Sequence, residues 1–351
     1  DYEEALDAAR RWAHERRFRV GVQVLRGIAR SHEAGSAFSA IAEACLAELY
    51  PIVVAEFARK HGPPPGEGAA VVAMGKLGSG EMTATSDLDL LVIYDPGEED
   101  ESRGPKPLPA TAYYARLTQA LVAAMTAPTA EGTLYAVDLR LRPSGRKGPV
   151  ATRLGAFRRY QAEEAWTWEH LALTRARVVA GAPAMRHTAV EAIEAVIGAP
   201  HPEAKTLSDV RDMRDRVASA NRTLRRQVWE LKLAEGGLLD IELAVQAGLL
   251  IHGLTGLRAP RLAAAALAER GWLSVDQAAA MIEAHELGLA LQQIERVALD
   301  RAFSPETAGP GLKAAMARAA GEADFPTVEA RLQQAQAAAA QAVTAVLERR
   351  R

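Results

Sequence analysis

The chain contains the segment Gly75-Lys76-Leu77-Gly78-Ser79-Gly80, followed a few residues later by Ser86-Asp87-Leu88-Asp89-Leu90. An apolar run over residues 69–74 precedes the glycine-rich segment, and its length predicts a short buried strand that ends at Gly75. A second apolar run predicts another strand over residues 87–95. Two buried strands are therefore expected, joined by a polar connection that is rich in glycine.

Two aspartates stand at the start of the second predicted strand. Residues two apart on a strand point to the same face, so Asp87 and Asp89 share one face and Leu88 and Leu90 share the other. Two neighbouring carboxylates repel each other, and a divalent cation between them removes that repulsion because hard cations prefer carboxylate oxygens. For a bare Asp-x-Asp pattern, a solvated strand end beside a turn is the alternative.

The glycine-rich segment predicts a phosphate-binding turn. Backbone N–H groups after a strand can hold phosphate, and Gly78, Ser79 and Gly80 are small enough to let phosphate approach. The alternative is a plain tight turn, and Lys76 either reaches a phosphate or is an exposed loop lysine. A Walker A loop requires Gly-Lys followed by Ser or Thr, and Leu77 fails that test, which argues against an ordinary P-loop ATPase.

A third acid lies on a further predicted strand over residues 134–141. Alternation places Asp138, Arg140 and Arg142 on one face and apolar residues on the other, which favours a polar cleft over plain solvent exposure. Three carboxylates can hold two metal ions, and arginines can neutralise phosphate charge, so these residues together suit phosphoryl-type chemistry. The alternatives are a salt bridge between Asp138 and either arginine, and structural ion pairs for the arginines.

The chain divides by composition and periodicity. Residues 1–62 carry helical periodicity and end at a Pro/Gly-rich run that stops a helix. Residues 63–152 combine the strands with an expected helix over 113–125 and an exposed, acidic loop over 96–109, which predicts a small α/β or α+β core. Residues 153–351 are expected to be helical, with subregions 153–255 and 259–351, and the alanine-rich stretch 333–345 favours a packed final helix.

Bulk composition narrows the functional class. The 351 residues carry a formal net charge of −2, so no basic field covers the chain and nucleic-acid binding is not expected. No uninterrupted apolar window reaches the length of about 18 residues for a membrane span, so no membrane partner is expected. The single cysteine, Cys45, lies in an apolar context that predicts a core residue, and its isolation fits a reducing cytoplasm. Because the chain begins at Asp1, we expect a fragment of a longer protein.

These motifs resemble those of the polymerase-beta-like nucleotidyltransferases, and more closely those of glutamine synthetase adenylyltransferase. The resemblance rests on residues 75–81, on Asp87-Leu88-Asp89, on residues 137–145 with Asp138, on residues 164–170 and 175–179, and on Glu235-Gly236-Gly237 with Asp240-Ile241-Glu242. Residues 164–170 look most like the C-terminal, adenylylating half of that bifunctional family. Ser79 stands where many relatives have glycine, and residues 82–85 are less familiar.

The resemblance implies an α+β fold, in which a nucleotidyltransferase core with a small mixed sheet is preceded by helices and followed by an all-α bundle. It implies AMP transfer from ATP to a tyrosine hydroxyl of glutamine synthetase, with Mg²⁺ or Mn²⁺ held by Asp87, Asp89 and Asp138. Triphosphate contacts would come from Gly78, Ser79, Lys76, Arg140 and Arg142. It also implies control by a nitrogen-signalling protein and by glutamine. The alternatives are the phosphorolytic, deadenylylating half and a non-catalytic nucleotide-binding module.

Other residues in the matching blocks carry weaker expectations. Trp166 and Trp168 lie two apart in a predicted helix, and core packing is favoured over base stacking. Glu169 and His170 are expected to be structural. Asp240 and Glu242 have no role that the residues themselves define, and packing or capping beside Gly236-Gly237 is as good an interpretation as chemistry.

Overall fold

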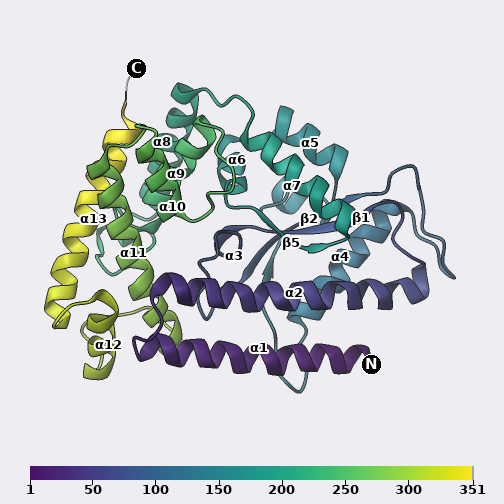
Figure 1. The fold of residues 1–351 in the computed structure, drawn as a ribbon, viewed down its shortest axis with the longest axis horizontal. Coiled ribbons are helices and arrows are strands. Elements are labelled where there is room, and N and C mark those ends of the chain that lie inside the picture. Colours follow the sequence, from purple (N-terminus) through teal and green to yellow (C-terminus); the bar gives the residue numbers. More distant parts are fainter. Residues whose placement is uncertain (350–351) are drawn as a thin grey trace. The chain divides into compact units, whose positions relative to one another are not determined.

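The computed structural model describes residues 1–349, and the chain forms two compact units (Figure 1). The first unit contains residues 1–18, 38–80 and 86–196, and the second contains residues 19–37, 81–85 and 197–351. The chain thus passes between the units several times. The domain boundaries expected near residues 62 and 152 stay a prediction, because units defined by packing are not the same as domains.

Two long helices begin the chain, as the periodicity of residues 1–62 predicts. They are α1, Tyr2–Leu25, and α2, Ser31–His61. Cys45 on α2 is buried, as expected, and burial raises the pKa of its thiol to about 11. By length and composition α2 could also cross a membrane, but half of its most apolar window is buried inside the protein, as in a core helix.

A five-stranded mixed sheet forms the centre of the first unit and confirms the predicted α+β class. Its strands are β1 (Gly68–Ala73), β2 (Leu88–Asp95), β3 (Val137–Asp138), β4 (Thr152–Arg153) and β5 (Arg177–Gly181). The order is β3-β2-β1-β5, and β4 also pairs with β2. β1 runs antiparallel to β2 and β5, whereas β2 runs parallel to β3 and β4.

Two expectations about the strands are wrong. The strand expected over residues 134–141 has only Val137 and Asp138 in the sheet, because the backbone N–H of Arg140 donates to Asp138 Oδ1 at 2.8 Å and the chain turns there. The region from residue 153 onward is not wholly helical either, since β5 pairs with β1 at the edge of the sheet. β5 is short and lies between helices, so its apolar run is too brief to predict a strand from the sequence.

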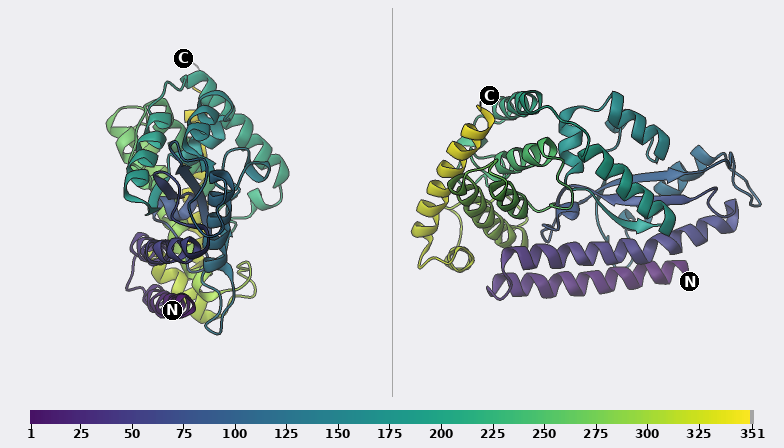
Figure 2. Two further views of the ribbon diagram at one scale, coloured as in Figure 1. Left: turned by 90° about the vertical axis from the view of Figure 1, so that its right-hand side faces the viewer. Right: turned by 45° about the horizontal axis from the view of Figure 1, so that its top comes forward.

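Helices cover both sides of this sheet. They include α4 (Ala110–Thr126), α5 (Leu154–Glu163), α6 (Thr167–Leu173) and α7 (Pro183–Ile197). Within the first unit, α2 runs along one side of the sheet and α5 and α7 lie on the other (Figure 2). Tyr94 of β2 stacks on Tyr114 of α4 with ring centroids 4.2 Å apart. Asp89 and Tyr94 are separated by an odd number of positions on β2, so their side chains point to opposite faces of the sheet. Asp89 therefore faces away from α4.

The second unit is a helical bundle centred on α11, Val275–Ala298. Around it pack α9 (Leu238–Ile251), α10 (Pro260–Glu269), α12 (Pro310–Ala320) and α13 (Phe325–Leu347), and α8 (Glu203–Ala220) packs on α9 and α13. The alanine-rich stretch lies in α13 and buries Ala339 and Val343, which confirms the prediction of a packed final helix. The segment 81–85 belongs to this unit, and Gln293 of α11 donates to the Met82 carbonyl at 2.8 Å.

Candidate functional site

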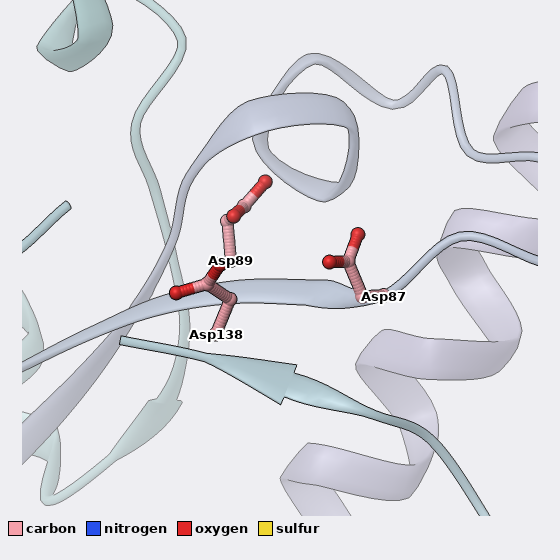
Figure 3. Close-up of side chains that lie close together, drawn as sticks. All are labelled: Asp87, Asp89 and Asp138. Carbon is pink, nitrogen blue, oxygen red and sulfur yellow. The ribbon is translucent and has the colours of Figure 1, made fainter. Parts of the chain in front are cut away.

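Three aspartates meet at the end of the sheet where β2 begins. β2 and β3 pair in parallel, with Asp89 directly opposite Asp138, so both side chains leave the same face. Asp87 immediately precedes β2, and carboxylate oxygens of all three residues lie within 4.8 Å of one another. Figure 3 shows the three side chains pointing to the same side of the two strands. The convergence expected from the Asp-x-Asp spacing and the third acid is therefore present.

The backbone around Asp89 is fixed from both sides. The N–H of Met74 donates to the Asp89 carbonyl at 2.8 Å, and the N–H of Leu88 donates to the carbonyl of Ala136 at 2.9 Å. Leu88 and Leu90 are buried beneath the site. Asp89 and Asp138 therefore stand on paired strands, and Asp87 directly precedes one of them, which suits a site that needs constant geometry.

Gly75 is the residue that makes room for Asp89. It has φ +52, and a Cβ built there would lie 2.2 Å from Asp89 Oδ2. A side chain at this position would push the carboxylate aside as well as strain the backbone. The sequence predicts only that a strand ends at Gly75 and gives no sign of this contact, since the register that brings Gly75 and Asp89 together is visible only in the sheet.

The predicted turn at Gly78 and Ser79 is a one-turn helix, α3 (Gly75–Ser79), closed by Gly80 at φ +77. A Cβ on Gly78 would lie 2.1 Å from the Arg175 carbonyl oxygen, so close packing accounts for this glycine. Ser79 is buried and donates to the Lys76 carbonyl at 3.3 Å, and Lys76 is half-buried. Contacts of these residues with a nucleotide stay a prediction.

Arg177 fastens α3 to the rest of the unit. Its guanidinium donates to the Leu77 carbonyl at 3.2 Å and pairs with the carboxylate of Glu43 on α2. The arginine thus links β5, α2 and the helical turn beside Asp89. No local pattern reveals this contact, because Arg177 and Glu43 are 134 positions apart.

Arg140 binds Asp138, as the salt-bridge alternative proposed. Its Nε donates to Asp138 Oδ2 at 2.5 Å, and this bond holds the pKa of Asp138 below its ordinary value although burial opposes it. The same contact raises the pKa of Arg140, with smaller contributions from Asp89 and Asp87. Asp138 is therefore ionised at neutral pH, and Arg140, with a smaller contribution from Arg146, offsets part of the charge of the three acids.

Arg142 does not share the face of Asp138 and Arg140, so the predicted alternation fails beyond the short strand. It is buried and donates to the carbonyls of Leu139 and Gly148, which fixes the loop after β3. Neither a phosphate contact nor an ion pair is needed to account for its burial. The loop that Arg142 fixes also carries Arg140, so Arg142 helps to position Arg140 at the site.

The donor set suits a hard divalent cation. All three side chains are carboxylates on one face of the sheet, and oxygen ligands are what Mg²⁺ and Mn²⁺ take in proteins. Arg140 offsets only part of the negative charge. The cluster could therefore bind a metal ion.

The tryptophans of the matching block are not core residues, so that expectation is wrong. Trp166 is 66% exposed and stands at the N-cap of α6, and Trp168, inside that helix, is 39% exposed. Glu169 is structural, as expected, since it accepts from the Trp166 N–H at 3.0 Å and from the Tyr160 hydroxyl at 2.8 Å. His170 Nε2 lies 3.0 Å from the Gln161 carbonyl oxygen.

Asp240 lies in the second unit, in the first turn of α9. It accepts from the Gly236 N–H at 3.0 Å, which is the capping role that the neighbouring glycines suggested. It also pairs with Arg225 at 3.0 Å and Arg214 at 3.2 Å. Glu242 is half-buried on the same helix.

Comparisons with known proteins agree with this geometry. A family model described as glutamate-ammonia ligase adenylyltransferase matches residues 1–192, and one described as GlnD PII-uridylyltransferase matches residues 209–349. Proteins called bifunctional glutamine synthetase adenylyltransferase/adenylyl-removing enzyme are 42% identical in Brucella suis (94% of this chain, 34% of the relative) and 43% identical in Xanthobacter autotrophicus (95% and 34%). The relative from Agrobacterium fabrum is 41% identical over 99% of this chain and 36% of its own length. The chain therefore spans about a third of the length of these relatives.

Proposed function

Because the chain belongs to the glutamate-ammonia ligase adenylyltransferase family, we propose that it transfers AMP from ATP to a tyrosine hydroxyl of glutamine synthetase. The observation that carries this proposal is the convergence of Asp87, Asp89 and Asp138 within 4.8 Å on one face of the sheet. A module that only binds nucleotide would not need three carboxylates arranged in this way.

The three aspartates would hold Mg²⁺, with Mn²⁺ as a substitute. Bound there, the ion would offset the negative charge of the triphosphate and stabilise the charge that develops during transfer. The short helix α3 lies at the end of β1 beside Asp89, so we assign triphosphate contacts to Gly78, Ser79 and Lys76. Arg140 is exposed and next to Asp138, and it would neutralise phosphate charge.

In the reaction, the tyrosine oxygen forms a bond to the α-phosphorus of ATP. The bond from that phosphorus to the oxygen bridging to the β-phosphorus breaks, and pyrophosphate leaves with the electron pair. The tyrosine proton must depart, and we assign its acceptance to Asp138, whose carboxylate lies beside those of Asp87 and Asp89. Asp87 and Asp89 would hold the ion, which would supply positive charge beside the triphosphate.

Partners and setting belong to the same proposal. The region 209–349 matches a family model whose description names PII, so we propose a PII-type nitrogen-signalling protein as a regulator, with glutamine as a second signal. A cytoplasmic setting fits a chain whose single cysteine is a buried thiol. Neither a membrane nor a nucleic acid is needed as a partner.

The test is a mass measurement on the protein substrate. Unmodified glutamine synthetase incubated with the chain, ATP and Mg²⁺ should gain the mass of one AMP per modified subunit, and the gain should vanish with Asp87→Asn. The absence of a gain, together with phosphate-dependent loss of AMP from modified glutamine synthetase, would assign the chain to the deadenylylating half instead. If neither reaction occurred, the remaining interpretation would be a module that binds nucleotide without catalysis.

A further inference from the structure

A pocket lined by arginines lies in the second unit. Its residues are distant in the sequence from the three aspartates, and it is rich in positive charge, whereas the aspartates carry negative charge. Its volume is about 290 Å³. Charged residues line most of it: Arg214, Arg222, Arg225, Arg226, Asp215 and Glu235. A second pocket of about 320 Å³ shares Arg225, Arg226 and Glu235 and continues toward α13. Positive groups outnumber negative ones even when the buried Asp240 is counted.

The block around Asp240 gives this pocket a rigid wall. Asp240 has a side chain only 1% exposed, and it receives both guanidinium groups, from Arg225 on one side and Arg214 on the other. The turn before it is fixed because Gly236 has φ +70 and a Cβ there would lie 1.9 Å from the Gln336 carbonyl oxygen. One buried carboxylate therefore orients two arginines whose side chains are 10% and 15% exposed.

Arg214 is not fully satisfied by its partners in the protein, whereas Arg225 donates to both oxygens of Asp240 and to the Leu233 carbonyl. Among the described residues, Arg214 Nε is buried and has no hydrogen-bond acceptor. The other acid within reach of Arg214 is Glu235, 3.8 Å away and 67% exposed, which makes it a weak and displaceable partner.

We propose that this pocket binds a small oxyanion, a phosphate or carboxylate group, through Arg214, Arg222, Arg225 and Arg226. The planar guanidinium fork matches the two oxygens of such a group, and preoriented arginines lose little side-chain freedom on binding. Arg214 and Arg225 form the floor, while the exposed Arg222 and Arg226 close over the anion from the rim. Glu235 competes with the anion for Arg214.

Titration calorimetry on the 351-residue chain tests the site, with inorganic phosphate in one arm and succinate in the other, each against chloride at equal ionic strength. Saturable binding of either probe is expected, and the arm that binds more tightly identifies the anion class. Arg222→Gln with Arg226→Gln should weaken binding about tenfold, since two positive charges at the rim are lost. Glu235→Gln should strengthen it, because the competing carboxylate is gone.

The matched control is Arg216→Gln, an exposed arginine on α8 that does not line the pocket, and it should leave the affinity unchanged. Asp87→Asn should also leave it unchanged, which separates this pocket from any phosphate bound near the aspartates. Binding no stronger than chloride in both arms would overturn the proposal. So would equal affinity in the rim variant, or a loss of affinity in Arg216→Gln as large as in the rim variant.

Discussion

The two units each hold a cluster of aspartate and arginine, with opposite charge balance. In the first unit Asp87, Asp89 and Asp138 face one arginine, Arg140, whereas in the second unit Asp240 lies between two arginines. The acid-rich cluster is partly exposed, and Asp240 is almost fully buried. The net charge of a cluster therefore selects the ion that it attracts, and the burial of an acid decides whether it acts on a ligand or supports the fold.

The largest effect should come from the acid-rich cluster. Asp87→Asn or Asp89→Asn should lower AMP transfer about a thousandfold or more, since a divalent ion contributes several kcal/mol to such a transition state. Stability should not fall, because removing one of three neighbouring carboxylates relieves repulsion. Mass spectrometry of glutamine synthetase measures the first effect and urea unfolding the second.

Asp100→Asn is the control, as Asp100 is exposed in the loop before α4. It should transfer AMP at the normal rate. Normal transfer by both Asp87→Asn and Asp89→Asn would show that the cluster is not the reacting site.

Asp240→Asn should cost stability instead. Removing the buried charge leaves Arg225 without a counter-charge and Arg214 with only the exposed Glu235, and breaking a buried pair in this way costs about 3–5 kcal/mol. Urea unfolding measures the loss. Asp215→Asn, an exposed acid on the same pocket wall, should change stability by less than about 0.5 kcal/mol. If both variants lost the same free energy of unfolding, Asp240 would support the fold no more than a surface acid does.

Gly75→Ala should affect the metal more than the fold. The new Cβ meets Asp89 Oδ2, which can turn away, and the remaining penalty is the positive φ, about 1 kcal/mol. Gly80→Ala shares the positive φ but meets no atom within 4 Å. Both variants should therefore lose similar stability, and only Gly75→Ala should bind Mn²⁺ more weakly in a titration. Equal Mn²⁺ affinity in the two variants would remove the role assigned to Gly75.

The smallest effect concerns pH. The pKa of Asp240 is lowered, because its pairing with Arg225 and Arg214 outweighs burial. A lowered folded pKa adds stability above the unfolded value of about 4, and that stability is lost as pH falls through the folded pKa. The difference in unfolding free energy between the natural chain and Asp240→Asn should be constant near neutral pH and shrink below about pH 4. A difference that stayed constant into strong acid would contradict the assignment.

Periodicity alone was enough to predict the helices of residues 1–62, two of the strands and the shared face of Asp87 and Asp89. The parallel pairing that places Asp138 opposite Asp89 was not predicted; the third acid and the family resemblance led only to the expectation that the three aspartates share a metal site. The strand over residues 134–141 was mispredicted, because the Arg140 N–H donates to the Asp138 side chain and this local hydrogen bond overrides strand propensity. Contacts such as Arg177 with Glu43 join distant parts of the chain and leave no local pattern.

The segment Glu81–Thr85 connects α3 to Asp87, yet it belongs to the second unit. Met82 and Thr83 are almost fully buried, and Gln293 holds the Met82 carbonyl. A gene truncated after residue 196 would therefore delete the side chain that anchors the stretch leading into Asp87. The two units are interwoven along the chain, and a fragment containing only the aspartates would have to fold without part of its own scaffold.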